Sequence, residues 1–356
     1  METPSSEVLK SVEKEISKLL EPFDSMEAVD KFLEEESLKK DPITRFLAYL
    51  LKTQVISIDQ KKNAKQLVDL IPEYIKTTKE YFGEDFESPL LKIAKRDRPT
   101  VEADIKRSYF LFVNSCKHYD VKDYKKYPDG KTIPSRALAT LAISDDKLSY
   151  TQGYDRYFFI SYALSLKFCE KVGLDFIFAE ALAYYLTKPL IINASFNDLL
   201  ENPGTYEGFS LLDEQIKKYC PNTYKVLSKG HLSAFNYAMR WRLLFFSDEH
   251  EIDGALLIWD YFLLHMDDTD QFFGYIGAAH VHQVEVDDDF TAVEKLQKFR
   301  DWDECKIIQD TKLMAAGKRL RSRNSGRRIF MLVSIIVLLS AAAYVYTKRF
   351  DIVSKF

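Results

Sequence analysis

Two short stretches of this chain carry residue types that could act on a phosphate group. In the first, Asp104 and Arg107 are three residues apart, so on a helix they are neighbours on one face, where the carboxylate can hold the guanidinium. Arginine stays charged and its planar fork can bond two phosphate oxygens at once, which lysine cannot do. The same spacing is that of an ordinary surface salt bridge, which contributes well under about 1 kcal/mol. Spacing alone leaves both interpretations open.

The second stretch, residues 150–154, reads Tyr-Thr-Gln-Gly-Tyr. The amide of Gln152 offers both a donor and an acceptor, so it can orient a water molecule without taking its proton. Gly153 has no side chain and lets the backbone approach another molecule closely. These residues could equally form the first turn of a helix, with Tyr150 and Tyr154 packed against neighbouring helices.

Two other candidate sites in the sequence lack residues that their motifs require. Residues 130–132, Gly-Lys-Thr, look like the end of a phosphate-binding loop, but the first glycine of that motif would fall on Lys125. We therefore expect the chain not to hold a nucleotide of its own. His280 and His282 are two apart, with no further ligand at a metal-binding spacing, so we expect no metal site.

The elements that must position the two stretches are expected to be helices. The 12 glycines among 356 residues argue against a glycine-rich doubly wound nucleotide-binding fold and against an all-β chain. Apolar residues recur at helical spacing, mostly in runs too long for strands, over 8–20, 38–56, 105–113, 157–172, 176–186, 234–246 and 254–265. Turn signals predict breaks at 127–130, 188–189 and 201–204. The pattern indicates an all-α fold.

The carboxyl-terminal part of the sequence has the pattern of a membrane anchor. Residues 329–347 are 19 positions without a charge, which as a helix would span roughly 28 Å, close to the thickness of a hydrocarbon core. A basic collar with six positive charges, residues 318–328, precedes this segment and places the larger, acidic part of the chain in the cytosol. We expect a single-pass, tail-anchored protein. An acidic body is a poor surface for nucleic acid, so no nucleic-acid partner is expected.

The two polar stretches resemble the signature motifs of a known family. Val101, Asp104 and Arg107 match the pattern IxxDxxR with valine in place of isoleucine, and residues 150–154 match YxQGM with Tyr154 in place of methionine. In this order they resemble the motifs of TBC-domain GTPase-activating proteins for Rab GTPases.

Weaker matches extend the resemblance over residues 40–285. Residues 45–51 are similar to the opening RxxxWxxLL motif of the family, with Tyr49 in the tryptophan position. Residues 239–241 and 257–261 resemble its late helices, in which a Trp-Asp pair follows a Phe-rich helix. The resemblance implies a multi-helix TBC domain, and the collar with its anchor is similar to a membrane-bound subgroup of the family.

The resemblance also implies roles for individual residues. Arg107 would be an arginine finger and Gln152 a glutamine finger, both supplied in trans to a Rab-family GTPase, with Asp104, Tyr150 and Gly153 in support. GTP and magnesium would be held by the partner Rab, so the chain needs no cofactor of its own and is not itself a GTPase.

The resemblance thus predicts a GTPase activator on an internal membrane, in endoplasmic reticulum to Golgi trafficking. The expected locality is the endoplasmic reticulum membrane or the early Golgi. Two alternatives stay open: a catalytically inactive TBC-fold scaffold that binds a Rab, and a tail-anchored helical adaptor whose motifs are coincidental. The expected division of the chain is an N-terminal helical segment 1–39, the TBC domain 40–285, a polar connector and collar 286–328, the transmembrane helix 329–347 and a short luminal tail 348–356.

Overall fold

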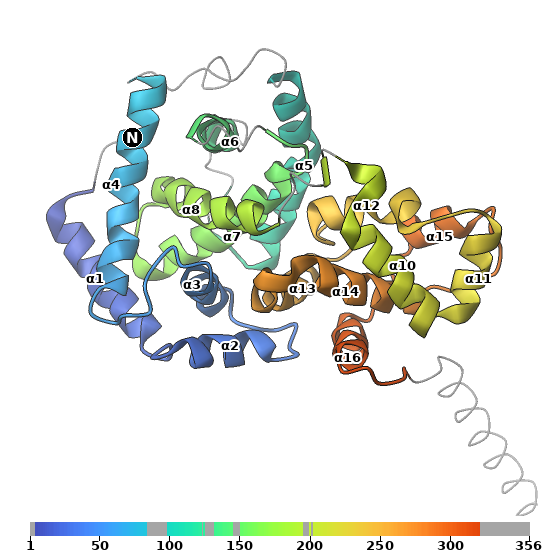
Figure 1. Cartoon of the computed structure of the whole chain (residues 1–356). Coiled ribbons are helices and arrows are strands. Elements are labelled where there is room, and N and C mark those ends of the chain that lie inside the picture. Colours follow the sequence, from blue (N-terminus) through green and yellow to red (C-terminus); the bar gives the residue numbers. More distant parts are fainter. Residues whose placement is uncertain are drawn as a thin grey trace, which may run out of the picture.

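The fold is built from helices that form two neighbouring groups (Figure 1). The computed structural model describes residues 4–83, 98–122, 124, 132–144, 150–194, 199–200 and 202–320, and no strand occurs among them. The expected all-α class is confirmed. The first group contains α1 (Ser6–Leu20), α2 (Met26–Glu34), α3 (Pro42–Lys52), α4 (Asn63–Phe82), α5 (Arg98–His118), α6 (Thr132–Ser144), α7 (Tyr154–Val172) and α8 (Ala179–Asn193). The second contains α10 (Glu207–Tyr219), α11 (Pro221–Lys229), α12 (Ala234–Leu244), α13 (Ile252–Leu264), α14 (Thr269–Gln283), α15 (Ala292–Lys298) and α16 (Glu304–Ala315).

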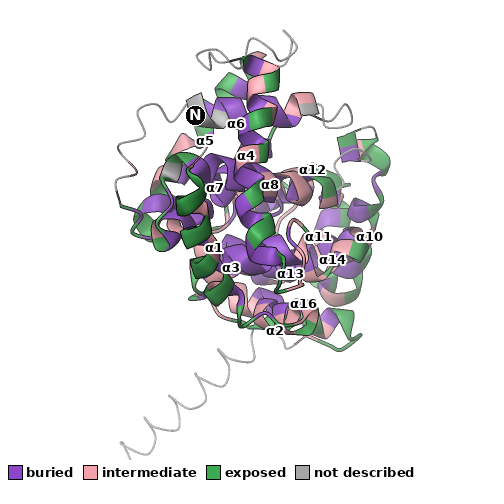
Figure 2. Ribbon diagram, turned by 90° about the vertical axis from the view of Figure 1, so that its left-hand side faces the viewer, coloured by how far each residue is buried: buried purple, intermediate pink, exposed green. Residues whose placement is uncertain are grey.

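One helix lies at the centre of each group. Helix α7 packs against α8, α5, α3 and α6, and nearly all of its residues are buried. Helix α14 packs against α10 and α16. The two groups meet where α13 lies against α2 and α3, so their buried side chains form one continuous core. Figure 2 shows the buried residues gathered on the inward faces of the helices and the exposed residues on the outside.

Local sequence sets where several helices begin and end. The Asp41 carboxylate accepts a hydrogen bond from the backbone of Thr44 and caps α3, whose first residue is proline. Helix α7 begins after Gly153 and ends before Gly173, and these two glycines have φ of +112° and +72°. Both angles lie in the region that favours glycine, so the central helix is bounded by two residues whose backbone needs no Cβ.

A buried ionic network joins the two groups. The Asp260 carboxylate on α13 accepts hydrogen bonds from Arg45 at 3.1 and 3.0 Å, from Tyr49 at 2.8 Å and from Lys40 at 2.9 Å. The side chains of Asp260 and Arg45 are fully buried, and that of Lys40 is 1% exposed. Several donors around one carboxylate offset the cost of burying its charge, so this contact fixes α3 against α13.

The predicted break at 188–189 is wrong, because α8 continues through Pro189 to Asn193. A proline inside a helix removes one backbone hydrogen bond and costs about 3 kcal/mol. Leu186, Leu190 and Ile191 are buried around it, and this packing outweighs the loss. The break at 201–204 coincides with a short 3-10 turn over Pro203–Thr205, and the break at 127–130 lies outside the described residues.

The segments on either side of the expected domain pack against it. Helices α1 and α2 contact α4 and α3, and α15 and α16 contact α12, α13 and α14, with Ile307 and Ile308 fully buried. The apolar residues of 286–315 therefore serve the core. Within the described ranges no helix is both long and apolar enough to cross a bilayer. The expected anchor 329–347 and tail 348–356 lie outside those ranges.

Candidate functional site

Arg107 stands on the exposed face of α5, where it is paired with Asp104. Its Nη2 donates to Oδ1 of Asp104 at 2.5 Å. The Arg107 side chain is 49% exposed while that of Asp104 is only 1% exposed. The carboxylate is therefore a buried and fixed partner, and the guanidinium reaches from it into solvent. The contact has the predicted spacing of a surface salt bridge, but one of its two groups is in the core.

Asp104 is itself held by a second side chain. The Tyr150 hydroxyl donates to Oδ2 of Asp104 at 3.0 Å, so each carboxylate oxygen has a partner. Burial raises the pKa of the Asp104 carboxyl, and the nearby Asp155 carboxylate adds to the rise. Burial and the same two carboxylates also raise the pKa of Tyr150, which keeps its hydroxyl a donor.

Gln152 also contacts the Arg107 guanidinium. In the amide orientation that satisfies both groups, Oε1 of Gln152 accepts from Nη1 of Arg107 at 3.1 Å and from Nη2 at 2.9 Å. Gln152 is exposed and lies in the loop before α7, whereas Arg107 lies in the middle of α5. Arg107 and Gln152, the two residues whose side chains the sequence singled out for chemistry on phosphate, thus lie in contact at one surface.

Gly153 fixes the loop that carries Gln152. Its φ of +112° is a conformation that residues with a Cβ rarely adopt, and it forms the N-terminal boundary of α7. A Cβ at this position would lie 2.7 Å from a methyl group of Leu244 at the end of α12. Tyr154 follows, 3% exposed, with its ring 5.7 Å from that of Tyr150 in an edge-on contact. Residues 150–154 therefore also form the helix N-terminal turn with packed tyrosines that the alternative interpretation expects, so this geometry does not separate the two interpretations.

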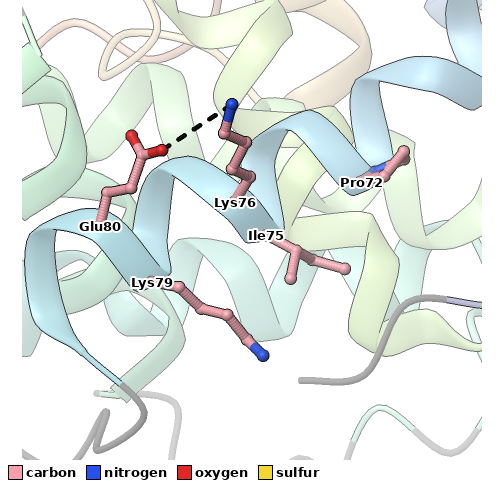
Figure 3. A pocket seen from close by; sticks show the side chains of 5 residues that line it. All are labelled: Pro72, Ile75, Lys76, Lys79 and Glu80. Atoms are coloured by element: carbon pink, nitrogen blue, oxygen red, sulfur yellow. Dashed lines mark ion pairs between the residues drawn. The ribbon is translucent and has the colours of Figure 1, made fainter.

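Arg107 and Gln152 are both exposed at the surface. One hollow of about 400 Å³ lies along α4 and is lined by Pro72, Ile75, Lys76, Lys79 and Glu80 (Figure 3). Another, of about 1040 Å³, lies between the α10–α11 junction and the segment after α14. Neither hollow is lined by Arg107 or Gln152. Because small-molecule sites are concave, an exposed pair of this kind suits contact with a macromolecule.

The two histidines considered as metal ligands face different partners. His280 is fully buried, its Nδ1 lies 2.7 Å from the carbonyl of Ile276, and its Nε2 lies 2.8 Å from Nε2 of His250. His282 lies beside Asp310, with Nδ1 2.8 Å from its carboxylate. In the part of the chain that the structure describes, no group of three or more histidine, cysteine, aspartate or glutamate side chains could hold a metal ion.

Comparison with known protein families decides the class of this fold. The sequence model of the Rab-GTPase-TBC domain matches residues 62–285. The chain belongs to this family. A comparison with curated protein sequences finds no match.

The TBC domain also resembles solved structures, though at low sequence identity. The crystal structure of the Ypt/Rab-GAP domain of Gyp1p is similar with a TM-score of 0.60 and 15% identity, over 86% of this chain and 96% of that one. The crystal structure of the Chlamydomonas flagellar RabGAP TBC domain has a TM-score of 0.46 and 15% identity, over 82% of this chain and 81% of that one. The first of these likenesses supports the TBC fold.

The structure joins the weaker TBC motifs predicted from the sequence. Arg45 and Tyr49, from the opening motif, bind the Asp260 carboxylate from the late Trp-Asp pair. The neighbouring Trp259 is fully buried and stacks on Tyr157, with ring centroids 5.0 Å apart. These motifs therefore hold the TBC core together.

Two further residues connect the helices of the candidate site and were not predicted. The Ser108 hydroxyl donates to the Asp155 carboxylate, which is fully buried in the first turn of α7. This contact ties the helix of Arg107 directly to the helix that follows Gln152. In the sequence, Ser108 follows Arg107 directly and Asp155 comes three residues after Gln152. A serine or an aspartate at such a position does not by itself predict a contact between the two helices.

Proposed function

We propose that this protein accelerates GTP hydrolysis on a Rab-family GTPase, with Arg107 as arginine finger and Gln152 as glutamine finger. The observation that carries the proposal is the contact between these two exposed side chains, which come from separate elements of a TBC domain. A buried carboxylate braces one of them and a glycine with positive φ positions the other.

The chemistry that Rab hydrolysis requires fits these two groups. Hydrolysis needs charge neutralised on the γ-phosphoryl oxygens and a water aligned for in-line attack. Arg107 would supply a permanent charge and two N–H groups to those oxygens. Gln152 would align the water through its amide, which accepts and donates at once. GTP and magnesium would be held by the Rab, so this chain contributes side chains and no cofactor.

The pairing of the two fingers suits the free protein. While no partner is bound, the Gln152 oxygen occupies guanidinium N–H groups that would otherwise face solvent. On docking, the guanidinium would turn toward phosphate and release the amide for water. Asp104 would stay in contact with Arg107 during this turn, because its buried carboxylate is held in place by Tyr150.

We also propose that the TBC domain works at a membrane. The uncharged residues 329–347 and the basic collar 318–328 support a single carboxyl-terminal anchor with the domain in the cytosol, as in the membrane-anchored subgroup of the family. A 19-residue span suits the thin bilayer of the endoplasmic reticulum, about 27 Å. In microsomes carrying the full chain, added protease should digest the domain and a glycosylation site appended after Phe356 should be modified. A protected domain or an unmodified site would overturn this arrangement.

The experiment for the enzymatic proposal uses the full chain in detergent against a panel of GTP-loaded Rab proteins. The Arg107→Ala variant should lose about 10³- to 10⁵-fold in the acceleration of hydrolysis, which is the range for an arginine finger. Arg300→Ala is the matched control, because Arg300 is 51% exposed and pairs at 3.0 Å with a fully buried carboxylate, that of Glu249. This control should keep wild-type activity.

Each outcome of the panel experiment has a definite meaning. If Arg107→Ala loses acceleration of GTP hydrolysis and Arg300→Ala keeps it, the finger assignment is supported. Equal activity of both variants and wild type would refute it. Binding of a Rab without any acceleration by the wild-type chain would instead identify an inactive TBC scaffold. Failure to bind any GTP-loaded Rab would leave the adaptor as the function of this chain.

A further inference from the structure

An aromatic side chain interrupts the polar surface of α5 one turn after Arg107. Phe110 is 54% exposed. The other large side chains along this exposed stripe are polar or charged, namely Lys106, Arg107, Asn114 and Lys117. A single exposed phenylalanine is ordinary on a protein surface, so its position alone carries no argument. What sets Phe110 apart is the way its ring is held.

The inner face of the Phe110 ring rests on a fixed cation. The guanidinium carbon of Arg156 lies 5.7 Å from the ring centroid. The Arg156 side chain is 7% exposed, and its Nη2 pairs with the Asp248 carboxylate at 3.1 Å. A desolvated guanidinium beneath an aromatic ring attracts it electrostatically. This contact favours the ring orientation that covers Arg156, which lowers the side-chain entropy to be lost on binding.

The Phe110 ring and Arg156 lie next to the two proposed fingers. Arg107 and Phe110 are three residues apart on α5, and Gln152 and Arg156 are four apart across the start of α7. The contact between Arg107 and Gln152 and the contact between Phe110 and Arg156 are therefore neighbouring links between the same two elements. Side chains three apart on a helix lie about 5–6 Å from each other.

The distance over which Arg107 can bond a phosphate determines which part of the partner covers the Phe110 ring. For Arg107 to bond a phosphoryl oxygen, the nucleotide has to come within about 3 Å of the guanidinium. A folded GTPase domain is tens of ångströms wide, so its surface beside the nucleotide would then lie over Phe110. Interfaces take most of their affinity from a few rigid aromatic or arginine side chains near their centre.

We propose that Phe110 is an anchor of the interface with the GTPase, where it is buried against an apolar patch beside the bound nucleotide. Arg156 and Asp248 are positioning residues that hold the ring ready. The inference rests on the proposed function, because the fingers define which surface the partner covers. Phe110 has no group that could act on phosphate, so it contributes to binding and not to the chemical step.

The test measures kcat and KM of Rab GTP hydrolysis with the full chain. Phe110→Ala should raise KM about tenfold, equivalent to about 1.4 kcal/mol, and leave kcat within about twofold. Phe110→Leu should recover most of the affinity, because an apolar contact requires no particular ring chemistry. Phe290→Ala, which removes a ring that is 91% exposed in the segment between α14 and α15, is the matched control and should change neither constant.

An unchanged KM in Phe110→Ala would overturn the assignment of Phe110. If kcat falls while KM stays unchanged, the ring positions Arg107 instead of binding the partner. Thermal unfolding of Phe110→Ala should match wild type to within a degree or two, since the ring is largely exposed, and a large fall would assign it a structural role.

A binding measurement separates this inference from the proposed function. Affinity for a GTPase loaded with GDP and aluminium fluoride can be measured without hydrolysis, and Phe110→Ala should weaken it by the same factor of about ten. If Arg107→Ala abolishes acceleration while Phe110→Ala binds as wild type, only the anchor is refuted. If the wild-type chain binds in a Phe110-dependent manner without accelerating hydrolysis, the anchor stands and the enzymatic proposal fails.

Discussion

Replacement of Asp104 by asparagine should lower activity and raise stability, a combination that ordinary damage to a fold does not produce. The substitution keeps the shape of the side chain and an oxygen that can accept from Tyr150, but removes the charge that holds Arg107. An arginine side chain loses about 2 kcal/mol of rotamer entropy when it is fixed. The contact with Gln152 at 2.9 and 3.1 Å would retain part of that order.

The expected magnitude for Asp104→Asn follows from this partial loss of order. Because Arg107 is half exposed, solvent screens its attraction to Asp104, and we take the loss as about 1–2 kcal/mol. This corresponds to a fall of about 5- to 30-fold in kcat/KM. The loss should stay well below the factor of at least about 10³ expected when Arg107 itself is removed.

The stability change in Asp104→Asn has the opposite sign. Burial, followed by the Asp155 carboxylate, raises the pKa of Asp104, so the folded chain binds a proton at this carboxyl more tightly than the unfolded chain does. The free energy of unfolding therefore falls as pH rises above the ordinary aspartate value of about 3.9, and it stays lower at neutral pH. Asparagine carries no charge, so the variant should be at least as stable as wild type at pH 7, with a smaller difference near pH 4.

The assay pairs single-turnover GTP hydrolysis with thermal unfolding at both pH values. Asp253→Asn is the control, because Asp253 also lies between a tyrosine and a basic side chain, accepting from Tyr119 at 3.3 Å and lying 2.9 Å from His118. It should leave hydrolysis unchanged. A variant of Asp104 that unfolds earlier than wild type at pH 7, or that keeps full activity, would refute the reasoning.

Three further predictions concern the same loop and the second group of helices. Gln152→Glu should reduce acceleration at least as much as Gln152→Ala, because a carboxylate would retain the neighbouring guanidinium and repel phosphate, and higher activity in the glutamate variant would contradict this. Gly153→Ala should lower the melting temperature more than Gly173→Ala in thermal denaturation, since both have positive φ but only the first would also meet Leu244, at 2.7 Å; equal shifts would remove the clash from the explanation. Burial lowers the pKa of His280, so the unfolded chain takes up protons first, and stability should decline as pH falls below about 6.5; His280→Gln should flatten this dependence in melts between pH 7.5 and 5.5, and an unchanged slope would assign it to other groups.

Part of the candidate site could be predicted because it is local. A spacing of three residues places Asp104 beside Arg107 on any helix, and the structure has this contact at 2.5 Å. The burial of Asp104 could not be predicted in the same way, because it depends on α7, whose position is set by packing far along the chain. The contact between Arg107 and Gln152 is likewise non-local, and only the resemblance to TBC motifs indicated it.

For the fold too, features set by local sequence could be predicted, and features set by packing between distant segments could not. Helical periodicity predicted the class, and α7 and α13 lie where long apolar runs were found. The end of α8 was placed too early because Pro189 is a strong local signal, and the buried side chains around it are visible only in the structure. Helices α15 and α16 mix polar and apolar residues, so the sequence alone gave no sign of how closely they pack against the core.

The network around Asp260 limits where this chain can be shortened. A fragment that starts at residue 62, where the family match begins, would retain Asp260 and lose all three side chains that donate to it, those of Lys40, Arg45 and Tyr49. A buried carboxylate deprived of its partners costs about 3–5 kcal/mol, a large share of the 5–15 kcal/mol by which a domain of this kind is stable. We therefore expect a stable fragment to begin before Lys40, some twenty residues ahead of the part by which the family is recognised.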